Sequence, residues 1–574
     1  MSEFFVDPGG DDSWPGSEPQ PFATLDRAVR AASEMTGAVV VQLRTGRHIL
    51  TDSLDITRGD ITFQAHGYGT AEQEEAVVSG GRQITGWQHR EGGWVAEVGD
   101  LDTRHLSSDG RRVERASIEM LPGTATSTDT GYVTDVTLDW HSPADVEFVH
   151  RGVYPWTEAR CAVASTTVDA DGTTTVTMAQ PAFGHAHTLY HFAWDGHVSR
   201  GPGLPTRIEN DPSFLTVPGT FVLDRSRPGR HLLRYLPLPG EDPEHTLVVA
   251  PALDVLVRVT GVCDIAFRGP TFADATWLRP AAEGFLHYHG GHYYTGGKVE
   301  TVTIEADRSW VTVPGESSVI PACVQIEDST GVRVDGCRFT HLGATGLGLT
   351  GGADLVVRDC DFGTLAASGI TATDSRDVVI EHNRIHHIGM DYSGAPGIAI
   401  SETSDCTVAH NHIAHAPHCG IVGGSARGTR ILHNLVTDTL TALADGGGIY
   451  LSGSQGDGAD NGALVRGNVI EDVHTPYNFG LYTDYGAAWV TVEDNVVRRA
   501  DSSSVLQVFP PLENVVYRRN FWDADPVGSD DVPPGVVYAD NTTLADPTAL
   551  DAATATLRAM AGPRRDDVDH LELG

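Results

Sequence analysis

The 574-residue chain has little positive charge: 39 lysines and arginines stand against 77 aspartates and glutamates, a formal net charge of −38. Lys298 is the only lysine. A surface of this sign repels phosphate backbones and anionic headgroups, which argues against nucleic acid and anionic membrane surfaces as partners. It also argues, more weakly, against polyanionic substrates such as pectin or alginate.

Long apolar runs and paired cysteines are absent as well. No stretch approaches the roughly 18 apolar residues of a membrane span, and the N-terminus lacks the basic and apolar segments of a secretory signal. The seven cysteines are odd in number and show no Cys-x-x-Cys or Cys-x-x-His spacing, so they predict neither a disulfide framework nor a zinc site. We therefore expect a soluble, cytoplasmic protein without a metal or other cofactor.

Between residues 335 and 520 there are no long runs of helical period, and a short motif recurs instead. Its copies begin 23 to 34 residues apart, and most are followed about ten residues later by Gly-Leu or Gly-Ile. Repeats of this length, made of short β-branched strands broken by Gly, Asn and Asp, predict a parallel β-helix. The leading residues are Cys337, Cys360, Asn383, Asn411, Asn434, Asn468, Asn495 and Asn520.

These leading residues should be structural. Stacked coils place equivalent residues about 4.8 Å apart, so the asparagines are expected to form a ladder of side-chain amides inside one turn. Cys337 and Cys360 occupy the same position of the repeat and are expected to be stacked, buried thiols.

The rest of the chain predicts an all-β protein with four regions and short capping helices. Residues 1–119 contain an amphipathic helix after Thr24 and the first coils, and 120–245 have longer alternating strands with hairpin signals, typical of an inserted antiparallel β-subdomain. Residues 246–545 form the main solenoid, and 546–574 form a C-terminal cap or tail.

The expanded coils are the informative ones, because a regular coil needs no long loop. Two of them carry Asp445-Gly-Gly-Gly-Ile-Tyr450 and Leu481-Tyr-Thr-Asp484. Strand alternation sends Tyr450, Tyr482 and Asp484 outward on one face, and Asp445 lies in a glycine-rich turn just before its strand. Two carboxylates and aromatic side chains in one groove are what glycoside hydrolysis requires, although Asp before Gly also forms ordinary turns.

Further residues complete the predicted site. Glu402 is the alternative catalytic carboxylate, and His418, close to the position that Asp445 takes one coil later, is a candidate for a substrate hydrogen bond. A metal site is not expected, since only His410-Asn-His412 offers a suitable pair. The predicted substrate-binding residues are His418, Tyr450, Tyr482, Asp391, Tyr392 and Tyr485.

Several segments, in this order, resemble the right-handed β-helix glycosidases of glycoside hydrolase family 141 and, more distantly, family 120. The resemblance implies hydrolysis of neutral sugar linkages in an oligosaccharide or glycoside, with α-L-fucosides and β-xylosides as substrate classes. It implies that Asp445 and Asp484 are the catalytic carboxylates. The segments are residues 5–12, 21–25, 78–87, 218–224, 341–346, 411–421, 445–450 and 481–484.

Other functions share this fold class. A polysaccharide lyase or uronan epimerase usually needs a basic groove and a Lys or Arg proton abstractor, which a chain with one lysine does not favour. A sugar-transferring enzyme would use the same carboxylates, so only product analysis separates it from a hydrolase. A non-catalytic carbohydrate-binding solenoid would lack a carboxylate pair within catalytic distance. The oligomeric state does not follow from the sequence.

Overall fold

The computed structural model describes residues 2–90, 93–305, 308–476, 478–500, 502–505, 510–527 and 531–563. The chain divides into two compact units. The solenoid unit comprises Met1–Gly80, Val255–Ala273 and Pro321–Gly574, and the inserted unit comprises Gly81–Asp254 and Asp274–Ile320.

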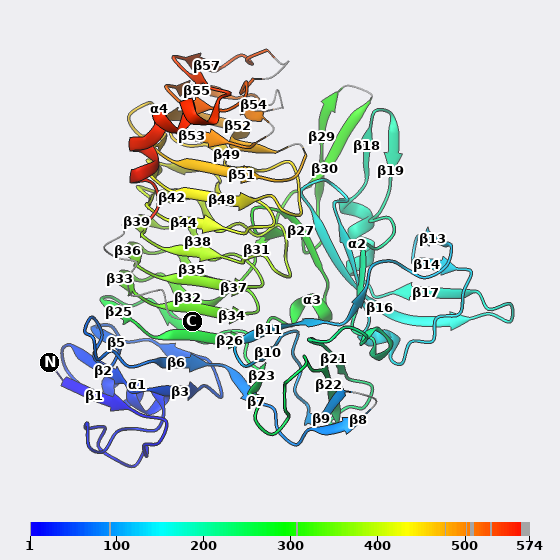
Figure 1. The fold of residues 1–574 in the computed structure, drawn as a ribbon, viewed down its shortest axis with the longest axis vertical. Helices are drawn as coiled ribbons and strands as arrows, with labels where there is room; N and C mark the ends of the chain where they lie inside the picture. The colour runs from blue at the N-terminus through cyan, green and yellow to red at the C-terminus, as the bar shows by residue number, and fades with distance from the viewer. Residues whose placement is uncertain are drawn as a thin grey trace. The chain divides into compact units, whose positions relative to one another are not determined.

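The solenoid unit is a right-handed parallel β-helix whose coils contribute strands to three faces (Figure 1). The first face carries the two predicted catalytic carboxylates, Asp445 and Asp484. Its strands pair in parallel from coil to coil. They are β4 (Leu54–Ile56), β24 (Val257–Thr260), β32 (Ala322–Glu327), β35 (Thr345–Thr350), β38 (Ile370–Thr373), β41 (Ile398–Ser401), β45 (Ile421–Gly423), β49 (Gly447–Ser454), β52 (Phe479–Glu493) and β54 (Ser502–Val505).

The second face begins with the N-terminal strand and runs the length of the unit. The long strand β52 also pairs with β50 and β55, so it bends from the first face into the second without a break. The strands are β1 (Ser2–Val6), β2 (Val39–Leu43), β5 (Ile61–Ala65), β25 (Ile265–Arg268), β33 (Thr330–Asp335), β36 (Ala353–Arg358), β39 (Arg376–Glu381), β43 (Thr407–Ala409), β47 (Arg430–Leu432), β50 (Ala463–Arg466), β55 (Glu513–Arg518) and β57 (Val536–Ala539).

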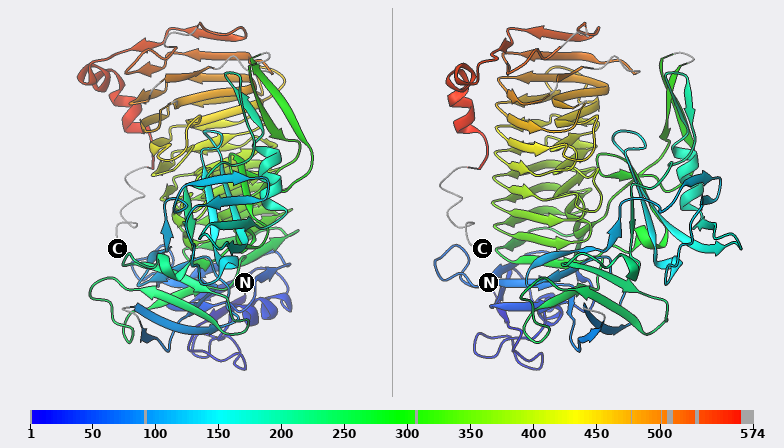
Figure 2. Two further views of the ribbon diagram at one scale, coloured as in Figure 1. Left: turned by 90° about the vertical axis from the view of Figure 1, so that its right-hand side faces the viewer. Right: turned by 45° about the vertical axis from the view of Figure 1, so that its right-hand side comes forward.

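The third face closes each coil, and Figure 2 shows the strands stacked one above another. Inward side chains of successive coils pack on their equivalents: the rings of Phe339 and Phe362 stack 4.3 Å apart. The strands are β3 (Gly46–Ile49), β6 (Ala76–Ser79), β26 (Thr271–Ala275), β34 (Arg338–Leu342), β37 (Asp361–Leu365), β40 (Arg384–His386), β44 (His412–Ala414), β48 (Leu435–Thr439), β51 (Val469–Val473), β53 (Val496–Arg498), β56 (Phe521–Trp522) and β58 (Thr542–Thr543).

The predicted asparagine ladder is confirmed at the turn between the second and third faces. Asn434 is typical: its backbone N–H and its Nδ2 both donate to Oδ1 of Asn468, at 2.8 and 2.9 Å, and Nδ2 also donates to the Val408 carbonyl. The ladder continues through Asn520 to Asn541, one rung further than predicted. None of the seven cysteines, all of which lie within the described residues, forms a disulfide.

Two helices accompany the solenoid. Helix α1 (Leu25–Ser33) begins at Thr24, whose hydroxyl accepts from the Arg27 N–H, and buries Leu25 and Ala28, as the amphipathic pattern predicts. Helix α4 (Pro547–Met560) packs beside the last coils against β53 and β56. Residues 564–574 of the predicted tail lie outside the described residues. No described helix is long and apolar enough to cross a membrane.

The inserted unit is built of mainly antiparallel sheets. The hairpin of β16 (Glu158–Val168) and β17 (Thr174–Met178) and the hairpin of β21 (Thr220–Asp224) and β22 (His231–Leu236) form at the predicted turns. Helix α2 (Ala182–Leu189) packs against β16.

The inserted unit begins and ends differently from the insertion expected over residues 120–245. It starts at Gly81 and returns to the solenoid at Val255. The chain then leaves the solenoid a second time, over Asp274–Ile320. That stretch contains β27 (Phe285–His289) and β30 (Ser309–Pro314), which pair with β16 and with β18 (Phe192–Trp194) of the first excursion.

Candidate active site on two adjacent coils

The two predicted carboxylates lie on adjacent coils, Asp445 in the turn before β49 and Asp484 within β52. The two strands pair in parallel with Ile449 opposite Leu481, Tyr450 opposite Tyr482, and Ser452 opposite Asp484. Ile449 and Leu481 are buried and, as alternation requires, they point to the opposite side of the sheet from the two tyrosines.

Each tyrosine hydroxyl donates to the carboxylate of the other coil. Tyr482 Oη lies 3.0 Å from Oδ1 of Asp445, and Tyr450 Oη lies 2.9 Å from Oδ2 of Asp484. The two rings meet edge to face, with centroids 5.1 Å apart. This crossed arrangement ties the two carboxylates to one rigid pair of rings and fixes their separation.

The turn before β49 is shaped to present Asp445. Asp445 has a φ of 54°, in the left-handed region, which Asp tolerates better than most residues. A Cβ on the next residue, Gly446, would lie 2.6 Å from Nε2 of His418 and 2.8 Å from Sγ of Cys419. Only glycine allows the turn to approach the coil before it this closely.

His418 is a support for this turn. Its side chain is fully buried, and its Nε2–H donates to the Ala444 carbonyl across 3.2 Å. Burial lowers the pKa of His418 to about 4, so the imidazole is neutral near pH 7. Predicted as a substrate ligand, it instead holds the residue next to Asp445.

The two carboxyl groups differ in their electrostatic surroundings. Burial, followed by the negative charge of Asp484, raises the pKa of Asp445 to about 7, and the hydroxyl of Tyr482 opposes the shift. Burial also raises the pKa of Asp484, but the Tyr485 N–H and the hydroxyls of Tyr450 and Tyr482 lower it. Asp445 is therefore the group that holds a proton near neutral pH, whereas the pKa of Asp484 is raised overall while its three hydrogen bonds favour the ionised form.

The tyrosines do not form the exposed aromatic surface that the sequence analysis expected. Tyr450 and Tyr482 are only 5% and 2% exposed and form a small buried cluster with Cys419, Val422 and Phe479. Their hydroxyls bind the carboxylates. Tyr485, just after Asp484, is 42% exposed.

The remaining predicted residues lie on other coils. Tyr392 is fully buried, while Asp391 beside it is half-buried. Their loop precedes β41, two coils before β49. Glu402 follows the far end of β41, three coils before β52, which is about 14 Å at the usual strand spacing. The structure thus brings Asp445 and Asp484 together and leaves Glu402 apart from them.

The His410–Asn411–His412 segment does not converge on a metal site. The ring of His410 stacks between those of His382 and His433, with centroids 5.1 and 5.2 Å away. His412 Nε2 instead lies 3.3 Å from the hydroxyl of Thr437.

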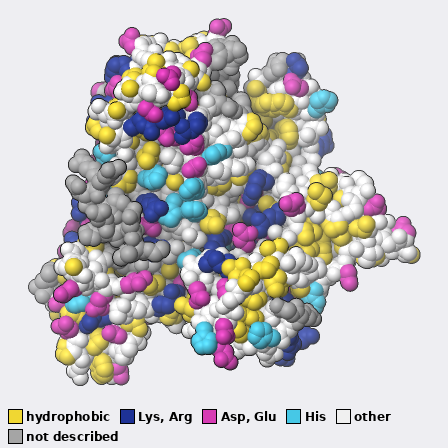
Figure 3. All heavy atoms as spheres, viewed as in Figure 1, with side chains coloured by type: hydrophobic (Ala, Val, Ile, Leu, Met, Phe, Trp, Pro, Cys, Tyr) yellow, Lys and Arg dark blue, Asp and Glu magenta, His cyan; other side chains and the backbone are white. Residues whose placement is uncertain are grey.

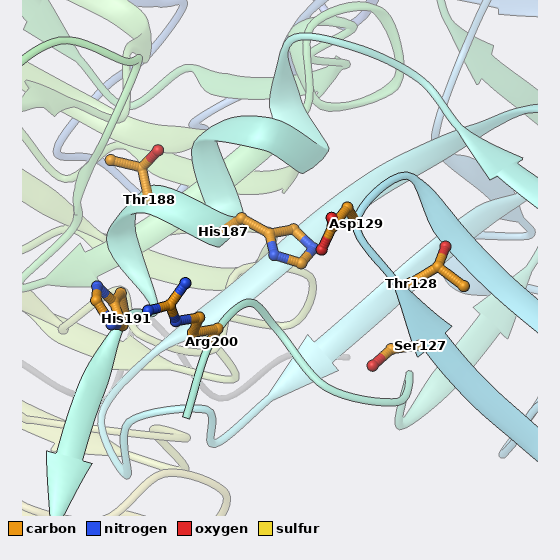
Figure 4. A pocket seen from close by; sticks show the side chains of 7 residues that line it. All are labelled: Ser127, Thr128, Asp129, His187, Thr188, His191 and Arg200. Carbon is orange, nitrogen blue, oxygen red and sulfur yellow. The ribbon is translucent and has the colours of Figure 1, made fainter. Parts of the chain in front are cut away.

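A polar cavity in the inserted unit was not anticipated from the sequence. It has a volume of about 380 Å³, and Figure 4 shows its lining side chains. They come from the end of β13 (Ala125–Thr128) and the turn to β14 (Gly131–Thr134), from α2 and from the segments after it, so no local motif groups them. The residues are Ser127, Thr128, Asp129, His187, Thr188, His191 and Arg200.

The inserted unit also buries a cluster of charges. Arg104 makes two hydrogen bonds to Glu147, at 2.6 and 2.7 Å, and Arg160 bridges Glu147, Glu158 and Glu209. Because the acids and bases satisfy one another, the cluster organises the core of this unit.

Comparison with known proteins supports the fold. Residues 317–458 and 366–509 match the family model described as right handed beta helix region. No curated protein sequence matches the chain.

Among solved structures, the chain is similar to one titled "Glycoside hydrolase", with 23% identity and a TM-score of 0.77 over 99% of this chain and 100% of that one. A complex of XylC with xylose has 13% identity and a TM-score of 0.49 over 90% and 75%. A lacto-N-biosidase from Eubacterium ramulus has 10% identity and a TM-score of 0.40 over 95% and 68%. The first similarity covers both units of this chain and supports the fold described above.

Proposed function

We propose that the chain is a glycoside hydrolase in which Asp445 is the general acid and Asp484 is the base or nucleophile. The observation that carries this proposal is a pair of half-buried carboxyl groups on adjacent coils. Each accepts a hydrogen bond from a tyrosine of the other coil, and the surroundings of the two groups give them different proton affinities. Glycosidases use one protonated and one ionised carboxyl group, kept different by their surroundings.

The chemistry follows from these two states. Protonated Asp445 gives its proton to the glycosidic oxygen as the bond to the anomeric carbon breaks. Ionised Asp484 either attacks that carbon or removes a proton from a water that attacks it. Tyr450 and Tyr482 hold both carboxyl groups in position, since each ring is packed and each hydroxyl donates to a carboxylate of the pair.

The substrate we propose is a neutral glycoside, of the α-L-fucoside or β-xyloside type. The resemblance to family 141 supports this choice, and so does the net charge of −38, which disfavours uronate polymers. The single lysine, Lys298, is exposed and its Nζ lies 2.9 Å from Glu300; such a residue is not suited to proton abstraction in a lyase.

The proposal is tested with aryl glycosides whose leaving groups differ in pKa, using wild type, D445N and D484N. An enzyme without its general acid should lose most activity on poor leaving groups and keep it on dinitrophenyl glycosides. D484N should be inactive on both. Azide added to D484A should yield a glycosyl azide if Asp484 is a nucleophile, and no such product if it is a base.

Activity that persists in both Asn variants, on every leaving group, would overturn the assignment. Unsaturated products would indicate a lyase, and new glycosidic linkages formed without net hydrolysis would indicate a transferase. No binding and no turnover of any glycoside in the panel would refute the proposed substrate class.

A further inference from the structure

His386, the last residue of β40, holds two partners at once. Its Nε2 lies 3.1 Å from Oδ1 of Asp361 on the preceding coil, and its Nδ1 lies 3.0 Å from Nδ1 of His387. Since Asp361 accepts the Nε2 proton, neutral His386 presents an unprotonated Nδ1 toward His387.

The local backbone explains how two consecutive side chains converge. In an extended strand, His386 and His387 would point to opposite faces. His387 instead has a φ of 49° and ends the strand, which brings its ring beside that of His386. A Cβ on Gly363, the register partner of His386, would lie 2.5 Å from Cε1 of the imidazole, so glycine there makes room for the ring.

Further imidazoles and carboxylates continue along the same edge. The ring of His415 lies 4.6 Å from that of His387, centroid to centroid. Asp438 then lies between His415, at 3.7 Å, and His474, at 3.0 Å. Figure 3 shows histidine side chains gathered on this side of the solenoid. We call the set the histidine edge: Asp361, His386, His387, His415, Asp438 and His474.

We propose that the histidine edge binds a divalent late transition metal of the Zn²⁺ class through Nδ1 of His386 and Nδ1 of His387. Two nitrogens bound to one tetrahedral Zn²⁺ at about 2.0–2.1 Å are roughly 3.3 Å apart. The existing separation of 3.0 Å therefore needs little change. The metal would replace the proton that the two Nδ1 atoms now share.

The surroundings of this pair fit such an ion. A metal-bound histidine typically donates its other N–H to a carboxylate, which is the role that Asp361 already plays for His386. His415, whose side chain is 52% exposed, supplies the third nitrogen by turning its ring toward the pair, and water completes the coordination. Imidazole donors select Zn²⁺, Cu²⁺ or Ni²⁺ over Mg²⁺ and Ca²⁺.

Binding there would connect two coils, because His386 and His387 lie at the end of β40 and His415 lies at the end of β44. The site is separate from Asp445 and Asp484 in its residues, so it would stabilise the solenoid without taking part in the proposed hydrolysis. Metal that binds only the folded chain raises its stability by mass action.

The test is a calorimetric titration of tag-free, full-length protein with Zn²⁺ near neutral pH, together with a thermal melt with and without the metal. We expect one high-affinity site per chain and a higher Tm with Zn²⁺. H387Q should abolish the site, and D361N should weaken it about 10- to 100-fold by removing the carboxylate behind His386. Co²⁺ bound in place of Zn²⁺ should give visible absorption bands that H387Q lacks.

H433Q is the matched control. It removes a solenoid histidine that stacks on His410 and should leave Zn²⁺ affinity unchanged. H386Q, checked by circular dichroism for a wild-type fold, provides an independent variant of the pair. The proposal is overturned if wild type binds no Zn²⁺, or if H386Q and H387Q both bind it as wild type does. Failure of the glycosidase tests would leave this result unaffected.

Discussion

The solenoid contains two sets of polar side chains that contact one another from coil to coil: the asparagine ladder and the carboxylate–tyrosine pairs. The two sets have different roles. In the asparagine ladder, each buried amide bonds to the identical residue on the next coil. On β49 and β52, acidic and phenolic groups meet instead, and each bond joins unlike groups. A ladder of identical groups satisfies every donor and acceptor, whereas the carboxylates keep free lone pairs and perturbed proton affinities.

The difference shows where the fold is stabilised and where it is able to react. Fully paired buried amides stabilise the coil and have no capacity left for a substrate. Half-buried carboxyl groups with raised pKa values cost stability, and such groups concentrate at functional sites. Substitutions in the ladder and in the carboxylate pair should therefore separate stability from catalysis.

Replacing Asp484 should affect catalysis alone. D484N should lower kcat/KM on the glycoside that the wild type cleaves by about 10³-fold or more, since a positioned carboxylate is lost. The urea midpoint should stay at or above the wild-type value, because an amide replaces a partly buried charge. A D484N variant that unfolds at much lower urea would place Asp484 with the structural residues.

Substitution in the asparagine ladder should lower stability and leave catalysis unchanged. N434A removes the hydrogen-bond partner of three buried groups, which are the N–H and Nδ2 of Asn411 and the Val408 carbonyl. It should cost about 3–9 kcal/mol, at about 1–3 kcal/mol for each unsatisfied group. N541A, at the half-buried last rung, should cost less. Urea unfolding followed by circular dichroism measures both, and N434A protein that remains folded should keep wild-type kcat.

Removing one hydroxyl at a time should shift the pH profile. The hydroxyl of Tyr482 lowers the pKa of Asp445 and also that of Asp484. Y482F should therefore move the alkaline limb of kcat/KM upward from about pH 7, and the acid limb upward with it. The bond from Tyr450 lowers the pKa of Asp484, so Y450F should move the acid limb upward. Identical profiles in wild type and both variants would mean that the crossed bonds do not tune the pair.

The smallest effect concerns stability against pH. The pKa of Asp445 is about 7 when folded and about 3.9 when unfolded, so its charge destabilises the fold increasingly as pH rises between these values. D445N should therefore have a Tm about 2–4 °C above wild type at about pH 8.5, and the gap should close near pH 4. D377N, at an exposed position, should show no such dependence.

The sequence predicts the solenoid well because the same short motif recurs in successive coils. Asn383, Asn411 and Asn434 recur before each third-face strand, and that recurrence alone requires stacking. Asp445 and Asp484 were found because their coils are long and glycine-rich. The crossed bonds to Tyr482 and Tyr450 were not foreseen, because alternation assigns a side chain to a face and says nothing about which neighbouring coil it contacts.

Two features could not be predicted because they depend on contacts between residues far apart in the sequence: the burial of loop side chains and the pairing of distant strands. Tyr392 was expected at the substrate and is fully buried, since nothing local tells an exposed loop tyrosine from one that fills a gap. The second excursion, Asp274–Ile320, has strands as short as those of the coils. Only its pairing with β16 and β18, more than a hundred residues earlier, removes it from the solenoid.

The shared register of the coils has a consequence for how this chain tolerates change in length. Each third-face strand pairs with the same offset from its leading residue, so Asp361, Arg384 and His412 occupy one column. Deleting the 23 residues from Asp361 to Asn383 would join Cys360 directly to Arg384 and leave one column continuous. A loss or gain of one whole coil is thus a smaller disturbance than the loss of one residue within a strand, which would turn the side chains in the rest of that strand to the wrong side.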